Sequence, residues 1–147
     1  MTTKFLLSLI AVFSTLAFSL SEYNRLKGNM DIFVRLNSFS HFAESNLHTE
    51  LRPISDILSE VFNIRLNDSM DFSLLEEKGL SITDTENLID YTIKYNYLNI
   101  EQIRNETQKL IRYTEQRLDE EKQRYHKKLP SLLCPPVCAI ILVLLII

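Results

Sequence analysis

Apolar residues gather into two uncharged runs near the ends of the chain, and polar residues fill the space between them. The first run is Phe5–Ser21 and the second is Leu129–Ile147. A helix needs about 20 apolar residues to cross a bilayer core of roughly 30 Å. The second run approaches that length, whereas the first is shorter and carries several hydroxyl side chains. The pattern predicts membrane helices at 1–21 and 129–147, with a polar domain at 22–128.

Within the polar domain, apolar residues recur at helical spacing, and no alternating pattern is long enough for a strand. The first helix is expected to continue through 29–51, and Pro53 is expected to occupy the first turn of a second helix. The buried stripe of the first helix is predicted at Phe33, Leu36, Phe39 or Ser40, Ala43, Leu47 and Leu51. The buried face of the second is predicted at Ile54, Ile57, Leu58, Val61 and Phe62. The expected fold class is therefore all-α, a small helical bundle flanked by the two membrane helices.

The second half of the polar domain predicts three further helical segments. A short turn of helix is expected at 72–78. Thr83 and Glu86 form the capping-box pattern, which predicts a helix start there, and Asn99 is expected to cap the last helix. The apolar face of the capping-box helix is predicted at Leu88, Ile89, Ile93 and Tyr97, and that of the last helix at Ile103, Leu110, Ile111, Leu118 and Tyr125. Prolines at 130, 135 and 136 are expected to bend or restart the last helix.

The charge distribution predicts the orientation in the membrane. Residues 22–128 hold all 19 acidic residues and 15 of the 16 basic residues. Lys and Arg accumulate on the cytoplasmic side of membrane helices, so the polar domain is expected in the cytosol, with the protein in the cell membrane. A basic cluster at the predicted membrane interface is formed by Lys122, Arg124, Lys127 and Lys128, where each cation gains about 1 kcal/mol near anionic lipid.

The middle of the chain is acidic. From Glu44 to Asp90 there are 11 acidic residues and three basic ones. This excess makes nucleic acid an improbable partner and favours a protein partner with a basic surface.

Candidate chemistry is sparse. His41, Glu44 and His48 share one helical face, but three side chains spread over two turns cannot all reach one ion without a partner helix. Cys134 and Cys138 are four residues apart, which suits apolar packing or reversible acylation better than a disulfide. No Gly-rich phosphate loop, nucleophile elbow or carboxylate dyad is present. The sequence predicts a protein that is not an enzyme and that needs no cofactor or metal.

Several short motifs occur in an order that resembles the stage III sporulation protein AB family of endospore-forming Firmicutes. Thr49-Glu50-Leu51 matches the end of the family's long first helix, and Pro53–Leu58 matches the start of the next. Leu80, Asp84 and Leu88 match a third motif, and 104–128 followed by the apolar tail matches the last part. The chain departs from the family in a shorter segment before Pro53, in the absence of most of a helical segment at 62–80, and in Asn96, where the family has glycine. It resembles a divergent, shortened member.

The resemblance implies a function and a set of partners. Members are similar in fold to the helical cytoplasmic domains of type II secretion platform proteins. They belong to the channel complex between mother cell and forespore, so the implied partners are the other stage III channel proteins and a cytosolic secretion-type ATPase. The mother-cell membrane around the forespore is then the expected location. On this interpretation the partner-binding residues are Glu44, Glu50, Asp56 and Glu60.

Two other interpretations of the sequence stay open. In one, the last helix zips with a partner and the protein is a tail-anchored coiled-coil adaptor, although its apolar positions do not keep a strict heptad beyond Leu118. In the other, Phe5–Ser21 is a signal peptide and the domain lies outside the cytoplasm. The oligomeric state, including a homo-oligomer, is not given by the sequence.

Overall fold

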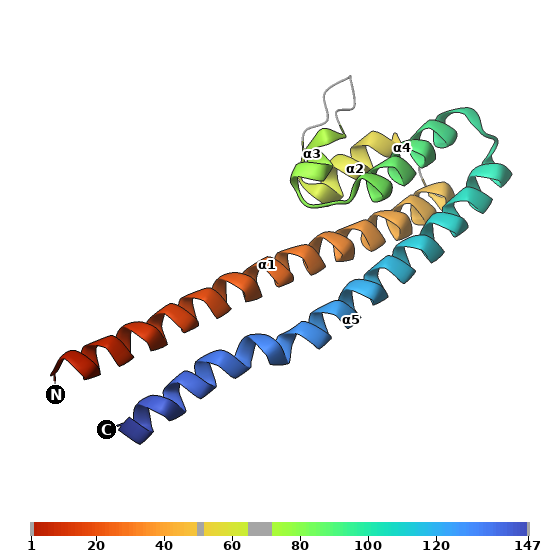
Figure 1. Ribbon diagram of the computed structural model, residues 1–147. Coiled ribbons are helices and arrows are strands. Elements are labelled where there is room, and N and C mark those ends of the chain that lie inside the picture. The colour runs from red at the N-terminus through yellow and green to blue at the C-terminus, as the bar shows by residue number, and fades with distance from the viewer. Residues whose placement is uncertain (1, 50–51, 65–71, 147) are drawn as a thin grey trace. The chain divides into compact units, whose positions relative to one another are not determined.

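The chain folds into helices throughout the part that the computed structural model describes, which comprises residues 2–49, 52–64 and 72–146. The helices are α1 (Thr2–His48), α2 (Ile54–Phe62), α3 (Ser73–Glu77), α4 (Ile82–Tyr97) and α5 (Ile100–Ile146), shown in Figure 1. No strand occurs within those ranges. The all-helical prediction is therefore confirmed.

The chain divides into two compact units. The terminal unit comprises Met1–Gly28 and Lys122–Ile147, and the body comprises Asn29–Glu121. The helices α1 and α5 contribute to both units, whereas α2, α3 and α4 belong to the body alone.

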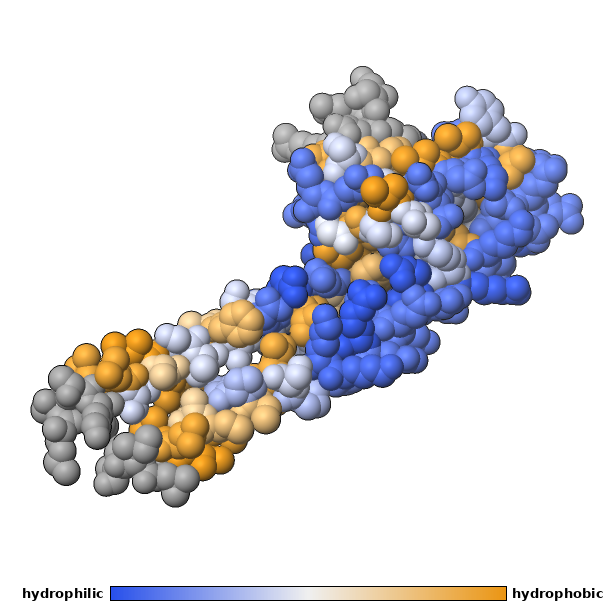
Figure 2. Space-filling model, viewed as in Figure 1, coloured by the Kyte–Doolittle hydropathy of each residue, from blue (hydrophilic) through white to orange (hydrophobic). Residues whose placement is uncertain are grey.

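In the terminal unit, both helices present apolar side chains to the outside. Exposed residues include Leu7, Phe18 and Leu144, and the surface over these segments is hydrophobic (Figure 2). By length and composition alone, α1 and α5 are each able to cross a membrane. The helix α5 is continuous through Pro130, Pro135 and Pro136, so the predicted restart is wrong.

The core of the body gathers large apolar side chains from all five helices. The stripe predicted on α1 is confirmed: Phe33, Leu36, Phe39, Ser40, Ala43 and Leu47 are all buried, and Leu51 lies outside the described residues. The helix α2 buries Ile54, Ile57, Leu58 and Phe62 and half-buries Val61, as predicted. Pro53 precedes α2 as its N-cap residue and does not lie within its first turn. The segment predicted at 72–78 is α3, which adds Leu75 to the core.

The predicted start and buried face of α4 need correction. The capping residue is Ser81, whose Oγ accepts from the backbone N–H of Asp84 at 3.1 Å, so the Thr83–Glu86 capping box is wrong. Leu88 is buried and Ile89 half-buried as predicted, but Ile93 and Tyr97 are exposed. The buried face consists of Asp84, Thr85, Leu88, Tyr91 and Thr92. Asp84 and Thr92 have hydrogen-bond partners inside the body, whereas the buried hydroxyl of Thr85 has none. Apolar periodicity does not register buried polar positions.

In the body, the cap and the buried apolar residues of α5 are those predicted from the sequence. Asn99 caps it, with its Oδ1 accepting from the backbone N–H of Gln102 at 2.9 Å. Ile103, Leu110, Ile111 and Leu118 are buried. Between them, Thr107 and Thr114 are fully buried, and Thr114 forms a hydrogen bond with Ser40 of α1 at 2.8 Å. The hydroxyl of Thr107 instead forms a hydrogen bond with Tyr91 of α4 at 2.8 Å.

Candidate protein-interaction site

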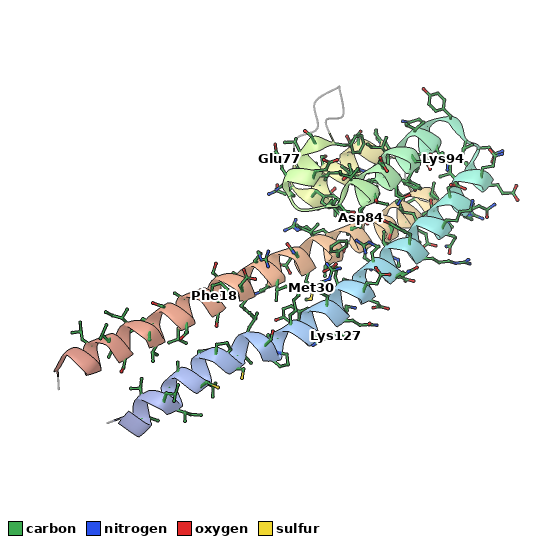
Figure 3. All side chains as sticks on the ribbon, viewed as in Figure 1. Phe18, Met30, Glu77, Asp84, Lys94 and Lys127 are labelled. Atoms are coloured by element: carbon green, nitrogen blue, oxygen red, sulfur yellow. The ribbon has the colours of Figure 1, made fainter. Side chains whose placement is uncertain are left out.

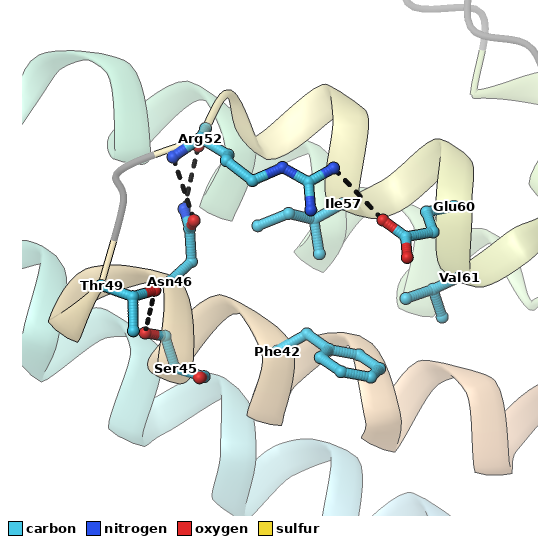
Figure 4. Close-up of a pocket in the computed structure, with 8 residues that line it drawn as sticks. All are labelled: Phe42, Ser45, Asn46, Thr49, Arg52, Ile57, Glu60 and Val61. Atoms are coloured by element: carbon cyan, nitrogen blue, oxygen red, sulfur yellow. Dashed lines mark hydrogen bonds and ion pairs between the residues drawn. The ribbon is translucent and has the colours of Figure 1, made fainter.

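A concave surface of the body lies between the C-terminal part of α1 and the helix α2. This interaction groove encloses about 380 Å³ and is lined by Phe42, Ser45, Asn46, Thr49, Arg52, Ile57, Glu60 and Val61 (Figure 4). Its volume is near the lower end of what a small-molecule pocket needs, and it is open to solvent. A groove of this kind suits a side chain or helix of another protein better than an enclosed ligand.

Asn46 builds the groove by fixing the turn from α1 to α2. Its side-chain amide donates to the carbonyl of Arg52 at 2.9 Å, and its carbonyl accepts from the backbone N–H of Arg52 at 3.0 Å. The same amide donates to the hydroxyl of Tyr95 on α4 at 2.8 Å. These bonds satisfy both side-chain polar atoms of a buried asparagine and hold the start of α2 against α1 and α4.

The groove combines an apolar floor with a charged rim. Phe42 is 58% exposed and lies in the groove beside Ile57 and Val61. Ile57 and Val61 continue the floor along α2, one turn apart. On the rim, Arg52 and Glu60 form an ion pair of 3.2 Å between exposed side chains. Apolar centre and polar rim are the pattern of protein–protein interfaces.

The structure separates the four acidic residues expected to bind a partner. Glu60 lines the groove, and Asp56 is exposed on α2 one turn before it. Glu44 lies away from the groove, where it accepts a hydrogen bond from Gln108 of α5. Glu50 lies outside the described residues. Of the expected set, Asp56 and Glu60 share a face of α2 and form one candidate acidic patch.

A buried ion pair inside the body was missed by sequence reasoning. Asp84 is fully buried on α4, and Arg117 of α5 binds both of its carboxylate oxygens, with Nε at 3.0 Å and Nη2 at 3.2 Å (Figure 3 labels Asp84). Tyr113 donates to the same carboxylate at 2.6 Å, and Ser81 donates at 2.5 Å. The guanidinium of Arg117 also lies over the ring of Phe33, 5.1 Å from its centre. The sequence indicates Asp84 only as part of the motif of Leu80, Asp84 and Leu88, and it predicts no charged partner on α5 for this residue.

The environment of Asp84 sets its charge. Burial alone would raise the pKa of Asp84, but hydrogen bonds from Arg117, Ser81 and Tyr113 outweigh it and lower the pKa. The hydrogen bond to Asp84 in turn raises the pKa of Arg117. The pair holds α4 to α5, and both carboxylate oxygens of Asp84 are already bonded.

The remaining candidate groups are distributed along α1 and α5. His41 lies 3.7 Å from Glu115 of α5, and within the described ranges no three His, Cys, Asp or Glu side chains gather closely enough to hold a metal ion. Cys134 and Cys138 are exposed free thiols with their sulfurs 3.9 Å apart. Lys122, Arg124, Lys127 and Lys128 are all exposed in the terminal unit.

These features define an all-helical protein with two long apolar terminal helices and a helical body that carries an open groove. No protein family model matches the sequence, and neither the curated proteins nor the solved structures contain a match to it.

Proposed function

We propose that this protein is a non-enzymatic membrane platform component whose body binds a cytosolic secretion-type ATPase. The observation that carries the proposal is the interaction groove, with exposed Phe42 on its floor and an acidic patch of Asp56 and Glu60 on α2. On this proposal both terminal helices cross the cell membrane and the body lies in the cytosol. The motif order that resembles the stage III sporulation protein AB family supports a place in the mother cell–forespore channel, with a body similar to that of type II secretion platform proteins.

The charge of the body supports an attractive contact with a basic surface. Glu60 lines the groove, and Asp56 is exposed one turn before it on the same helix. Complementary charge increases the rate of encounter and fixes the orientation of the partner, while buried aromatic anchors contribute most of the affinity. Asp56 and Glu60 would attract and orient the partner, and Phe42 would contribute the affinity of a buried anchor.

The coiled-coil adaptor is a weaker alternative because the apolar face of α5 is already used. Ile103, Leu110 and Leu118 are buried in the body, so they are unavailable to a partner helix unless the body opens. No comparable observation favours the adaptor.

Charge reversal in the groove tests the proposal directly. Full-length protein carrying both Asp56→Lys and Glu60→Lys should bind the secretion-type ATPase encoded in the same genome at least about tenfold more weakly, because attraction becomes repulsion at the rim. Binding is measured between purified proteins in detergent micelles by biolayer interferometry. The matched control carries Glu86→Lys and Glu101→Lys, two exposed acidic residues outside the groove. Equal affinity of wild type and groove variant would refute this docking site.

The orientation of the body gives a second test. A single cysteine in place of Glu77, which is exposed on α3, is introduced into a protein with Cys134→Ser and Cys138→Ser. A membrane-impermeant maleimide should leave this cysteine unlabelled in intact cells and label it after permeabilisation, because the flanking Lys and Arg hold the body in the cytosol. Labelling in intact cells would place the body outside and favour a signal peptide. Intact-mass measurement then shows whether residues 1–21 have been removed.

A further inference from the structure

The two helices of the terminal unit are brought into register by a pair of tyrosines. The rings of Tyr23 on α1 and Tyr125 on α5 lie 6.3 Å apart at an angle of 55°, and both side chains are half-buried. The two ends of the chain lie at the same end of this unit, so the helices run antiparallel there (Figure 1). Tyrosine is enriched where membrane helices leave the hydrocarbon, since its ring is apolar and its hydroxyl polar.

This register places one lysine from each helix at the same level. Lys27 follows Tyr23 by four residues and Lys122 precedes Tyr125 by three. Residues three and four apart share a helix face, and in an antiparallel pair both steps lead away from the uncharged segments. Lys27 and Lys122 therefore flank the seam one turn beyond the tyrosine pair, and both are exposed.

Two further lysines lie on the membrane side of the tyrosines. Lys127 and Lys128 directly precede Leu129, the first residue of the uncharged C-terminal segment, and both are exposed (Lys127 is labelled in Figure 3). Their long aliphatic stems allow the ammonium groups to reach the headgroup layer from that depth. We call Lys27, Lys122, Lys127 and Lys128 the lysine collar.

Positive charge predominates in the two segments that carry the collar, although Asp119, Glu120 and Glu121 directly precede Lys122. The segments 22–28 and 122–128 together contain six Lys or Arg residues and one acidic residue, Glu22. Glu22 is paired with Arg25 at 2.7 Å, so this pair adds no net charge beside the collar. A lysine ammonium is a compact, mobile donor that suits a phosphate oxygen.

We propose that the lysine collar is a binding site for an anionic phospholipid, with Lys27 and Lys122 holding the headgroup phosphate above the Tyr23–Tyr125 pair. The site uses one lysine from each terminal helix, so it is complete only when α1 and α5 are paired at the tyrosines. A bound lipid thereby joins the two helices at the membrane surface. The inference rests on the membrane placement in the proposed function, and it does not depend on the ATPase.

Lipid retention tests the site in the full-length protein. The protein is purified in mild detergent, supplied with equal amounts of phosphatidylglycerol and phosphatidylcholine, and examined by native mass spectrometry. Wild type should retain phosphatidylglycerol in preference to phosphatidylcholine. In the Lys27→Gln, Lys122→Gln double variant, the ratio of retained phosphatidylglycerol to phosphatidylcholine should fall roughly tenfold to thirtyfold. The matched control, Lys78→Gln with Arg104→Gln, removes two exposed positive charges from the body and should retain the preference.

Three results would overturn the inference. They are equal retention of the two lipids by wild type, an unchanged preference in the double variant, and displacement of the lipid by inorganic phosphate at equal concentration, which would identify a free-phosphate site.

Far-ultraviolet circular dichroism checks that the double variant is folded, and Tyr125→Phe, which keeps the ring, should retain the preference. Because binding to the ATPase is measured separately, absence of a lipid preference in the wild-type protein with intact ATPase binding refutes the collar alone. An intact lipid preference with equal ATPase affinity of wild type and groove variant refutes the platform docking site alone.

Discussion

Replacing Arg117 with methionine should lower the free energy of unfolding by about 2–4 kcal/mol, because Asp84 would remain buried without its charged partner. The carboxylate of Asp84 is fully inaccessible, so no solvent can replace the two hydrogen bonds from the guanidinium. The guanidinium itself is 23% exposed, which keeps the expected loss below that of a completely buried pair. Urea unfolding of the full-length protein in micelles, followed by circular dichroism, measures the change.

Removing both charges tests whether the loss of stability comes from a buried charge that has no partner. Asp84→Asn with Arg117→Met should be less destabilising than Arg117→Met alone, since no charge is then left in the core. Arg112→Met is the matched control, because Arg112 is exposed one turn from the pair, and it should stay within about 0.5 kcal/mol of wild type. A double variant no more stable than the single would contradict the ion-pair account.

In the Arg117→Met variant, the pH dependence of stability should have the opposite sign to that of wild type. In wild type the folded-state pKa of Asp84 is lowered, so its contribution is complete above the unfolded pKa and is lost as pH falls through the folded pKa. Without Arg117, burial should raise the folded pKa, so the variant should lose stability as pH rises above the unfolded pKa. The deficit relative to wild type should therefore be larger at pH 7 than at pH 3.

Replacing Phe39 with alanine should cost about 3–5 kcal/mol, since it opens a cavity at the centre of the body. Phe39 is fully buried and its ring meets that of Tyr91 edge-on, with centres 6.2 Å apart. Such a loss is a large part of the stability of a small domain. It should appear as a much lower urea midpoint in the measurement used for Arg117.

In contrast to Phe39→Ala, we expect Phe42→Ala on the same helix to affect partner binding and to leave stability almost unchanged. Its side chain is mostly exposed on the floor of the interaction groove, so the stability should change by less than about 1 kcal/mol. The affinity for the ATPase should nevertheless fall severalfold, as for an interface anchor. Loss of stability in both variants would mean that Phe42 belongs to the core, and unchanged affinity would mean that the groove is not the contact.

The accuracy of the sequence prediction depended on which side chains occupy the core. On α1 the buried positions are large and apolar, so their spacing predicted the stripe from Phe33 to Leu47. On α4 the core positions include Asp84, Thr85 and Thr92, and the apolar periodicity selected the exposed Ile93 and Tyr97 instead. Asp84 is bonded by Tyr113 and Arg117 of α5, and no local pattern contains that information.

The sequence did not predict the groove, although it did predict a role for one of the charged residues that line it. Glu60 was among the expected partner-binding residues because the middle of the chain is acidic. The groove itself requires Asn46 to bind both backbone groups of Arg52 and the hydroxyl of Tyr95. The distance along the chain from Asn46 to Tyr95 is 49 residues, and contacts at that separation leave no periodic trace.

The hydroxyl contact between Ser40 and Thr114 spans 74 residues of sequence, and this separation sets an order of events during synthesis. At 5–20 residues per second, the ribosome needs roughly 4–15 s to add the residues between them. Throughout that interval the apolar stripe of α1 has no α5 to cover it. On the proposed membrane placement, the N-terminal segment would enter the bilayer before the body closes. Its closure is a late step that begins only when the chain is nearly complete.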